Sequence, residues 1–128
     1  MAQDPSHGVR TYRDLVAWQE AMALAEQVYH VTEGFPKRET FGLTAQMRRA
    51  AVSVPSNIAE GFGRAKTLDF RRFLSIARGS LFEVQTQAEL ARRLAWLQGD
   101  ACAALRDQSQ RVDAILSGLI RSVGRRKT

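Results

Sequence analysis

Few side chains of this sequence combine the types and the spacing that catalysis or metal binding requires. Neither His7 nor His30 has the i, i+4 partner found on metal-binding helices, and one cysteine cannot supply a structural zinc site. That cysteine, Cys102, falls beside an apolar stripe, so we expect it in the core and not as a nucleophile. The Gly-Phe-Gly-Arg run that starts at Gly61 lacks the Gly-Lys-Ser/Thr continuation of a phosphate loop. We therefore expect no enzyme, no bound metal and no cofactor.

Positive charge is the more informative feature. The 128 residues carry 19 Lys and Arg against 13 Asp and Glu, a formal net charge of +6 at pH 7. Nearly all of the positive residues are arginines, which suits planar recognition of phosphate, although the base composition of a genome can produce the same bias. Residues 1–37 are net negative, whereas residues 38–98 and 99–128 are net positive. An acidic partner such as nucleic acid would therefore meet the second and third helices and the C-terminal tail.

Seven cations in residues 48–78 are the candidate nucleic-acid-binding residues. Four of them surround one predicted turn between two helices, so we expect them to lie close together and to hold phosphates with strongly salt-dependent affinity. The alternative is a solvated end of the fold, paired locally with Glu60 and Asp69. The seven are Arg48, Arg49, Arg64, Lys66, Arg71, Arg72 and Arg78.

A second group of polar residues interrupts apolar surroundings on the same two segments. Buried polar groups must be hydrogen-bonded, because each unpaired one costs about 1–3 kcal/mol. We interpret the group as a structural polar network near Pro55, and a subunit contact or an RNA-binding surface is the alternative. Its members are Ser53, Ser56, Asn57, Glu60, Ser80 and Glu83.

Four long segments with helical periodicity must position these side chains. Apolar residues recur every three or four positions over residues 13–33, 38–62, 67–97 and 100–123, and no alternating strand pattern competes with them. Short connections make consecutive helices antiparallel. We therefore predict an all-α, up-down-up-down four-helix bundle over residues 12–123, preceded by a disordered segment, 1–11, and followed by a basic tail, 124–128.

Two details of these helices bear on assembly and shape. The first helix carries two apolar stripes side by side, so one can face the core while the other contacts a second subunit. The stripes are Leu15, Trp18, Met22, Ala25 and Tyr29, and Ala17, Ala21, Leu24, Val28 and Val31. Pro55 lies inside the second helix, where we expect a kink or a local break, and Thr67 is the expected N-cap of the third.

Composition also bears on the compartment. The longest uncharged stretches, such as residues 50–59, are far shorter than the roughly 20 residues of a membrane helix. The N-terminal residues lack the basic and apolar regions of a secretory signal, and a lone cysteine forms no internal disulfide. These features favour a cytoplasmic protein that has no contact with a membrane.

Several motifs resemble one known family. They are Tyr12-Arg-Asp-Leu-Val-Ala-Trp-Gln19, Phe35-Pro-x-x-Glu39, the stretch from Leu43 to Arg64 with Ser53-Val-Pro-Ser-Asn-Ile-Ala-Glu-Gly61 inside it, and Phe73-Leu-Ser-Ile-Ala-Arg-Gly-Ser-Leu-Phe-Glu83. Over residues 12–123 the chain resembles the four-helix-bundle proteins encoded in intervening sequences of bacterial 23S rRNA genes, and it is similar to the accessory variability proteins of diversity-generating retroelements.

That resemblance implies a homopentamer of bundles around a central channel. In the retroelement members a basic surface of the ring is thought to bind nucleic acid and a reverse transcriptase, and the matching positions here are Arg48, Arg49, Arg64 and Arg78. The hypothesis is a non-enzymatic, homo-oligomeric nucleic-acid-binding adaptor that holds RNA, DNA or an RNA–DNA hybrid through phosphate contacts, with a reverse transcriptase as a further partner if one is encoded nearby. The alternative is a protein–protein interaction scaffold with no direct nucleic-acid role.

Overall fold

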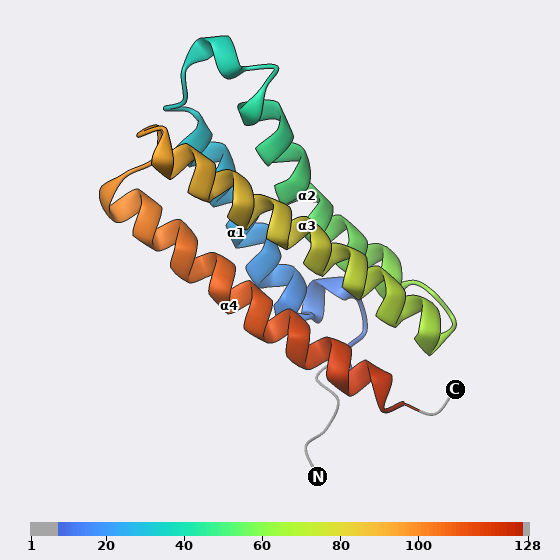
Figure 1. Ribbon diagram of the computed structural model, residues 1–128. Helices are drawn as coiled ribbons and strands as arrows, with labels where there is room; N and C mark the ends of the chain where they lie inside the picture. The colour runs from blue at the N-terminus through green and yellow to red at the C-terminus, as the bar shows by residue number, and fades with distance from the viewer. Residues whose placement is uncertain (1–7, 127–128) are drawn as a thin grey trace.

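Four α-helices and two short 3-10 helices make up the part of the chain that the structure, a computed structural model, describes, residues 8–126 (Figure 1). The 3-10 helix η1, Tyr12–Asp14, leads into α1, Val16–Thr32, and the 3-10 helix η2, Lys37–Glu39, leads into α2, Leu43–Phe62. The two longest helices follow, α3, Thr67–Arg93, and α4, Gly99–Gly124. No helix within residues 8–126 is long and apolar enough to cross a membrane.

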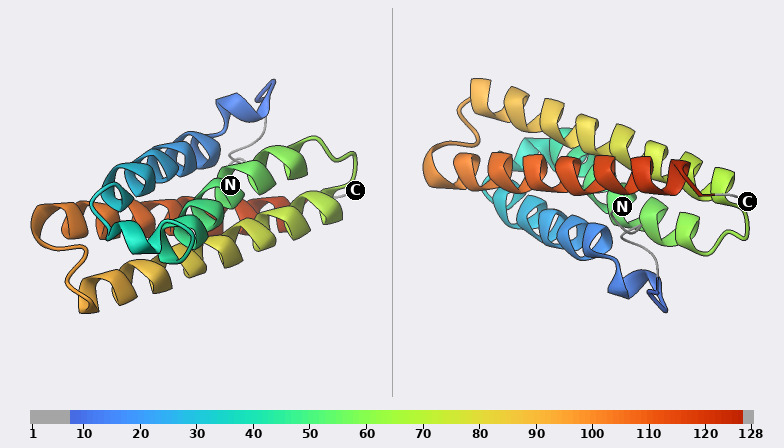
Figure 2. Two further views of the ribbon diagram at one scale, coloured as in Figure 1. Left: turned by 90° about the horizontal axis from the view of Figure 1, so that it is seen from above. Right: turned by 90° about the horizontal axis from the view of Figure 1, so that it is seen from below.

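The helices pack in the order in which they follow along the chain. Helix α1 contacts α2, α2 contacts α3 over the longest seam, α3 contacts α4, and α4 returns to α1. Neighbouring helices run antiparallel, as Figures 1 and 2 show, and among the described residues the diagonal pairs bring no Cα atoms within 8 Å of each other. The predicted all-α, up-down-up-down four-helix bundle is therefore confirmed.

The core is built from one apolar stripe of each helix. The apolar periodicity predicts one inward stripe for each of α2 and α3, and these stripes are buried except for Ala88, which is half-buried, and Ala95, which is exposed. Their members are Leu43, Met47, Ala50, Val54 and Ile58 in α2, and Phe70, Leu74, Ala77, Leu81, Val84, Ala88, Ala91 and Ala95 in the segment of α3. Met47, Ile58 and Leu81 have no exposed surface.

In α1, the core is filled by Ala17, Ala21, Leu24 and Val28, which belong to one of the two predicted stripes. The other stripe is divided, because Leu15 and Ala25 are buried whereas Met22 at 36% and Tyr29 at 44% remain exposed.

Helix α2 begins at Leu43, later than the predicted start at residue 38. Residues 37–39 form η2 instead, and Gly42 separates it from α2 with φ −102° and ψ −119°, far from helical values. The carboxylate of Glu39 then accepts a hydrogen bond from the backbone N–H of Leu43 at 3.0 Å. Once started, α2 is continuous through Pro55, so the local break that we allowed there does not occur.

Helix α3 ends at Arg93, earlier than the predicted 97. Ala95 adopts φ +62°, and the N–H groups of Ala95 and Trp96 donate to the carbonyls of Arg92 and Ala91. These two bonds form the Schellman motif that terminates many helices, usually with glycine at the left-handed position. The predicted N-cap of α3 was also wrong by one residue, since Lys66 occupies that position and its side chain makes no capping bond.

The chain ends bear on the predicted flanking segments. Within residues 8–11, Val9 packs against the core and the N–H of Arg10 donates to the carboxylate of Asp14. Helix α4 runs one residue further than predicted, to Gly124, and Arg125 is its C-cap. Residues 1–7, which include His7, and residues 127–128 lie outside the described residues.

Candidate nucleic-acid interface

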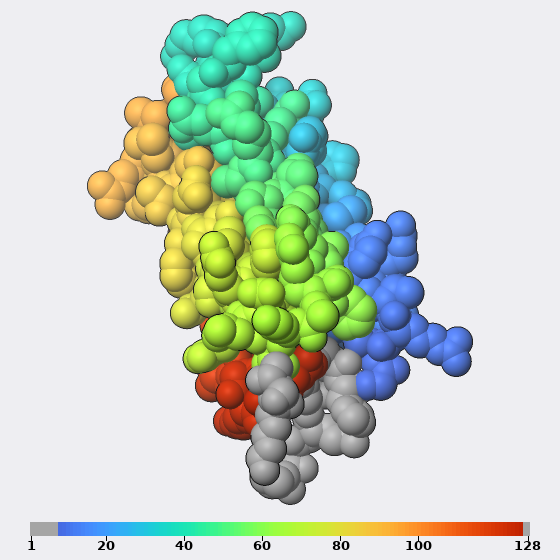
Figure 3. Space-filling view, turned by 90° about the vertical axis from the view of Figure 1, so that its right-hand side faces the viewer, coloured from blue at the N-terminus to red at the C-terminus, as the bar shows by residue number. Residues whose placement is uncertain are grey.

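One end of the bundle collects cations from the turn between α2 and α3. Arg64, Lys66, Arg71 and Arg72 are all exposed there. The spacing of the sequence predicted that these four lie together because they flank a single short turn. Figure 3 shows residues 60–72 at this end of the molecule, beside the C-terminal part of α4.

The C-terminal end of α4 adds two arginines that the sequence did not place there. The Arg71 Nε lies 3.1 Å from the position that a Cβ would occupy on Gly124, so α4 ends directly against this part of α3. The guanidinium of Arg126 lies over the ring of Phe70, 5.4 Å from its centroid. We call the six cations the basic end: Arg64, Lys66, Arg71, Arg72, Arg125 and Arg126.

Charge is distributed unevenly along the long axis of the bundle. Three segments in the half of the molecule that holds the basic end, residues 8–14, 60–72 and 117–126, together hold nine Lys and Arg against three Asp and Glu. Those nine include Arg10, Arg13 and Arg121 besides the basic end itself. The opposite end of the molecule, residues 26–42 and 89–107, is close to neutral. The net charge of +6 is therefore concentrated at one pole.

Local ion pairs account for only part of the basic end. Arg64 pairs with Glu60, one helical turn before it, at 2.9 Å, and its guanidinium also lies 4.7 Å from the centre of the Phe73 ring. Lys66, Arg71 and Arg72 form no ion pair with any side chain in residues 8–126, and neither does Asp69. The predicted alternative of local pairing therefore describes Arg64 and leaves three cations available.

Arg48 lies elsewhere, on the seam between α1 and α2. Its Nε donates to Thr32 Oγ1 at 2.8 Å and its Nη2 donates to the backbone carbonyl of Tyr29 at 3.3 Å. The same guanidinium lies 4.6 Å from the centre of the Tyr29 ring and 3.5 Å from Glu33. It meets the last carbonyls of α1, where a cation is favourable because of the helix dipole. Arg48 thus joins two helices.

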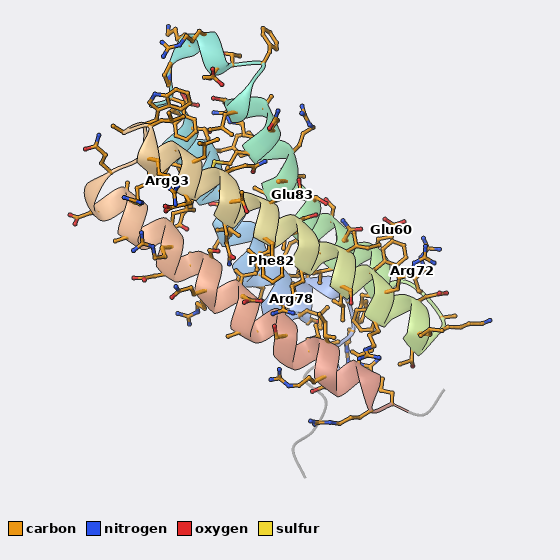
Figure 4. All side chains as sticks on the ribbon, viewed as in Figure 1. Glu60, Arg72, Arg78, Phe82, Glu83 and Arg93 are labelled. Carbon is orange, nitrogen blue, oxygen red and sulfur yellow. The ribbon has the colours of Figure 1, made fainter. Side chains whose placement is uncertain are left out.

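Arg78 is also held by the protein itself. Its Nε donates to Asp113 Oδ1 at 2.8 Å, and the guanidinium lies 4.9 Å from the centre of the Phe82 ring. Figure 4 shows Arg78 between α3 and α4, well away from Arg72 near the α2–α3 turn. Arg49 is exposed on α2 and has no ion pair within residues 8–126. The structure therefore brings together four of the seven candidate residues and leaves Arg48, Arg49 and Arg78 apart from them.

The polar group on α2 and α3 is brought together in part. Ser53 Oγ lies 2.8 Å from Ser80 Oγ, and Asn57 Nδ2 donates to Ser53 Oγ at 2.9 Å and to the Ser53 carbonyl at 2.8 Å. These three side chains link the two helices. Glu60 turns to Arg64 instead, and Ser56 and Glu83 are exposed.

Residues considered for catalysis or metal binding lie apart from one another. His30 is exposed near the end of α1, and Cys102 is half-buried against the core. Within residues 8–126 no group of three or more His, Cys, Asp or Glu side chains could hold a metal ion. Among residues 8–126, the one acidic group with a large pKa shift is far from the basic end, on α3. Hydrogen bonds from Arg92 and Arg93 lower the pKa of Glu89 to about 2.

An apolar depression runs along the seam of α1 and α2. Its deeper part, about 580 Å³, has walls of Trp18, Met22 and Tyr29 on one side and Val52 and Pro55 on the other. A second hollow of about 610 Å³ shares Tyr29 and Val52 with it and ends at Phe41. We call the two together the α1–α2 trough. Its aromatic wall is formed by the half-buried and exposed members of the α1 stripe that also contributes Leu15 and Ala25 to the core.

Phe41 is the residue of this region that sequence reasoning missed. It is 96% exposed, in the turn between η2 and α2. It belongs to no apolar stripe, and a single aromatic residue among Lys, Arg, Glu and Thr gave no periodic signal. The segment around it projects at the end of the molecule opposite the basic end (Figure 3).

Comparison with known proteins agrees with the helical organisation. The family model of the 23S rRNA-intervening sequence protein matches residues 13–118. The fold is similar to the crystal structure of a protein of unknown function from the S23 ribosomal protein family of Bacteroides thetaiotaomicron, with a TM-score of 0.76 and 20% sequence identity over 83% of this chain and 96% of that chain. At that identity the likeness concerns the fold alone. No curated protein matches the chain.

Proposed function

Because this chain belongs to the 23S rRNA-intervening sequence protein family, we propose that it is a non-enzymatic, homo-oligomeric adaptor that binds nucleic acid. The ligand is RNA or an RNA–DNA hybrid, held through its phosphates at the basic end. The resemblance in sequence adds the expectation of a pentamer, which would present five copies of this end.

The observation that carries the proposal is the set of unpaired cations at the start of α3. Arg64, Arg125 and Arg126 follow the C-termini of α2 and α4, where cations offset the negative pole of a helix. Lys66, Arg71 and Arg72 lie instead within two turns of the N-terminus of α3, where the dipole gives a cation no stabilisation. An anion bound among these three cations would explain why they gather at this position.

Phosphate is the anion that the position suits best. Helix N-termini present backbone N–H groups to phosphate, and the N-cap of α3, Lys66, makes no side-chain capping bond that would occupy them. Arginine side chains such as Arg71 and Arg72 add forked donors that match phosphate oxygens. Contacts of this kind position a nucleic acid without reading its bases. We therefore expect affinity for the backbone with little sequence preference.

The test is a charge reversal at the basic end with a matched control. Arg71→Glu/Arg72→Glu removes two proposed phosphate contacts, and Arg93→Glu/Arg106→Glu makes the same change in net charge at the other end of the bundle. Fluorescence titration of a structured RNA at low and moderate salt compares the two variants. We expect the first to lose more than about tenfold in affinity and about two units of salt slope, and the control to change little.

Two results would contradict the proposal. Wild-type protein that does not bind RNA at about 50 mM salt would exclude it, since phosphate contacts are strongest there. Equal losses in the two variants would show that net charge, and not the basic end, controls binding.

The second candidate function is a protein–protein interaction scaffold. The observation that favours it is the α1–α2 trough, whose Tyr, Trp and Met walls have the composition of protein interfaces. In that case the basic-end variant keeps its function in cells, whereas a charged residue in the trough abolishes it. If a reverse transcriptase is encoded nearby, it is the expected protein partner under either candidate function.

A further inference from the structure

A pocket of about 340 Å³ opens on the seam between α3 and α4, apart from the basic end and from the α1–α2 trough. Figure 4 shows the stretch of α3 that borders this α3–α4 pocket, between the labelled residues Arg78 and Arg93. Part of the wall is apolar, since Val84, Ala88 and Leu105 line the pocket and belong to the core or pack against it. A volume of this size accommodates a small organic molecule.

Small side chains keep this seam open. Ala88 of α3 and Cys102 and Ser109 of α4 line the pocket from its two sides. Ser109 falls between Leu105 and Val112 in the buried stripe of α4, at a position where a larger apolar side chain would fill the space. Both helices are continuous around the pocket, so its walls are in place before a ligand enters.

The hydroxyl of Ser109 lacks a hydrogen-bond partner. The residue is 4% exposed, and its Oγ, which is shielded from solvent, makes no hydrogen bond within residues 8–126. Buried hydroxyls are normally satisfied by a neighbouring group, an ordered water or a ligand, because an unpaired one destabilises the folded protein. Rotation about χ1 turns the Oγ of a serine without moving its helix. An acceptor that enters the pocket would therefore supply the missing partner.

Three longer polar side chains of the pocket wall are also unpaired. Gln85, Arg106 and Gln110 make no side-chain hydrogen bond or ion pair within residues 8–126. The guanidinium group and the two amide groups all supply N–H donors, and the guanidinium accepts no hydrogen bond. Together with the hydroxyl of Ser109, these groups suit a ligand whose polar end accepts several hydrogen bonds.

The charges around the pocket favour an anion with a single charge. Both carboxylates of the wall are already neutralised, since Glu89 accepts hydrogen bonds from two arginines of α3 and Asp113 accepts one from Arg78 at 2.8 Å. Arg106 is left as the unpaired charge of the wall. One guanidinium matches one carboxylate in charge and in the geometry of its donors, whereas a phosphate monoester brings nearly two negative charges.

We infer that the α3–α4 pocket binds a small organic carboxylate with an apolar body. The carboxylate meets Arg106 at the rim and accepts a hydrogen bond from Ser109, and the apolar body packs on the side of the pocket that Val84 and Ala88 form. The inference adds a ligand to the bundle and is independent of the nucleic acid proposed for the basic end.

Cys102 provides a direct readout of the occupied pocket. It is the one cysteine of the chain, it is half-buried, and it lines the pocket. Iodoacetamide should therefore alkylate this single thiol in the free protein, and mass spectrometry follows the rate. Naphthylacetate and the smaller phenylacetate are the probes. Either probe, once bound, should cover the thiol and slow its alkylation in proportion to the occupancy that calorimetry measures.

A neutral ligand and two variants test how the carboxylate is recognised. Naphthylacetamide has the same ring system without the charge, and Arg106→Gln removes the guanidinium that meets the charge. Each change should weaken binding at least about tenfold, the effect of one lost charge-assisted hydrogen bond. Arg121→Gln makes the same change in net charge at an exposed position of α4 outside the pocket, and it should bind naphthylacetate like the wild type.

Ala88→Leu tests the location, because the larger side chain fills the pocket. This variant should lose both the binding of naphthylacetate and the protection of Cys102, and circular dichroism verifies that it is folded. If it does not fold, Arg106→Gln still decides, since Arg106 is exposed and outside the core.

Three results would overturn the inference. The first is an alkylation rate that neither probe changes at millimolar concentration, as expected if only water occupies the pocket. The second is equal affinity for naphthylacetate and naphthylacetamide, and the third is an equal loss of affinity in Arg106→Gln and Arg121→Gln. None of these results bears on RNA binding at the basic end, so the two proposals stand or fall separately.

Discussion

Ala95 is the non-glycine residue within residues 8–126 that adopts a positive φ, +62°. An L-residue in this region brings its Cβ close to a carbonyl oxygen, at a cost of roughly 1–2 kcal/mol. The bonds from Ala95 and Trp96 back to Arg92 and Ala91 hold the conformation and let Leu97, which is buried, reach the core. The backbone at the end of α3 is therefore strained, and the burial of Leu97 in the connection to α4 offsets this strain.

We expect Ala95→Gly to stabilise the protein. Glycine adopts positive φ without the steric cost, and part of this gain is offset by the greater freedom of glycine in the unfolded chain. The net increase in the free energy of unfolding should be about 0.5–1 kcal/mol in urea denaturation. Ala103→Gly, an exposed position inside α4, is the matched control and should lose about 1 kcal/mol. Destabilisation by both substitutions would show that Ala95 is not strained.

Glu89 gives a prediction about pH. Hydrogen bonds from Arg92 and Arg93 lower its pKa from the ordinary 4.5 to about 2. Because the folded-state pKa is depressed, the ion-pair contribution is complete above pH 4.5 and is lost as the pH falls towards 2. Carboxyl-carbon NMR should show Glu89 titrating near pH 2, and Glu89→Gln should remove this part of the acid sensitivity. A titration midpoint near 4.5 would show that the two arginines do not hold the carboxylate in solution.

Among the elements, α2 and α3 approach each other closely at Gly61. A Cβ at this position would lie 2.7 Å from the Cβ of Phe73 and 3.1 Å from the Phe70 ring. The absence of a side chain thus allows the last turn of α2 to pack directly on the start of α3. Since the basic end includes residues on both sides of this junction, the glycine also determines how Arg64 lies relative to Arg71 and Arg72.

Gly61→Ala should therefore destabilise the bundle. The new methyl group forces α2 away from Phe73, and overpacking of this kind costs about 1–3 kcal/mol, more than the helix propensity that alanine gains. Gly79→Ala is the control, because Gly79 is exposed on α3 and a Cβ there meets nothing within 4 Å. Chemical denaturation should show a loss for Gly61→Ala and a gain of about 0.5–1 kcal/mol for Gly79→Ala.

The same elements show what sequence periodicity can predict. The stripes of α2 and α3 were predicted correctly because each helix has a single apolar face, with Met47, Ile58 and Leu81 at its centre. Helix α1 has two such faces. Periodicity alone does not say which of the two will pack in the core. The helix ends depended on Gly42 and Ala95, whose backbone angles follow from local hydrogen bonds and tertiary packing.

The sequence predicted correctly those neighbours in the candidate site that lie close together along the chain. Arg64, Lys66, Arg71 and Arg72 flank one turn, so their proximity followed from the length of the loop. The approach of Arg126 to Phe70 depends on the packing of α4, which joins residues far apart in the chain. The hydrogen bonds of Arg48 and Arg78 to other helices likewise depend on tertiary structure. From the sequence alone, both arginines were therefore predicted to be available for nucleic acid.

At the scale of the whole molecule, the uneven charge predicts how binding depends on salt. If the four cations that flank the α2–α3 turn, Arg64, Lys66, Arg71 and Arg72, each contact one phosphate, the logarithm of the association constant should fall against the logarithm of the salt concentration with a slope of about −3. Between about 50 and 200 mM salt the affinity of one protomer should fall roughly a hundredfold. Titrations with an RNA too short to contact two protomers measure this without the effect of multivalency. A flat salt response would place the contact away from these cations.

The cyclic packing of the helices has a consequence for how the chain folds. Three of the four interhelical seams join neighbours in sequence, and the seam between α1 and α4 joins the two ends of the chain (Figure 2). Folding rates rise when contacts are local, so the successive helical hairpins should form quickly and the α1–α4 seam should close last. During synthesis α1, α2 and α3 can assemble before α4 leaves the ribosome. Until then the nascent chain exposes the flank of α1 that α4 will cover, and this flank is the surface on which incomplete chains should aggregate.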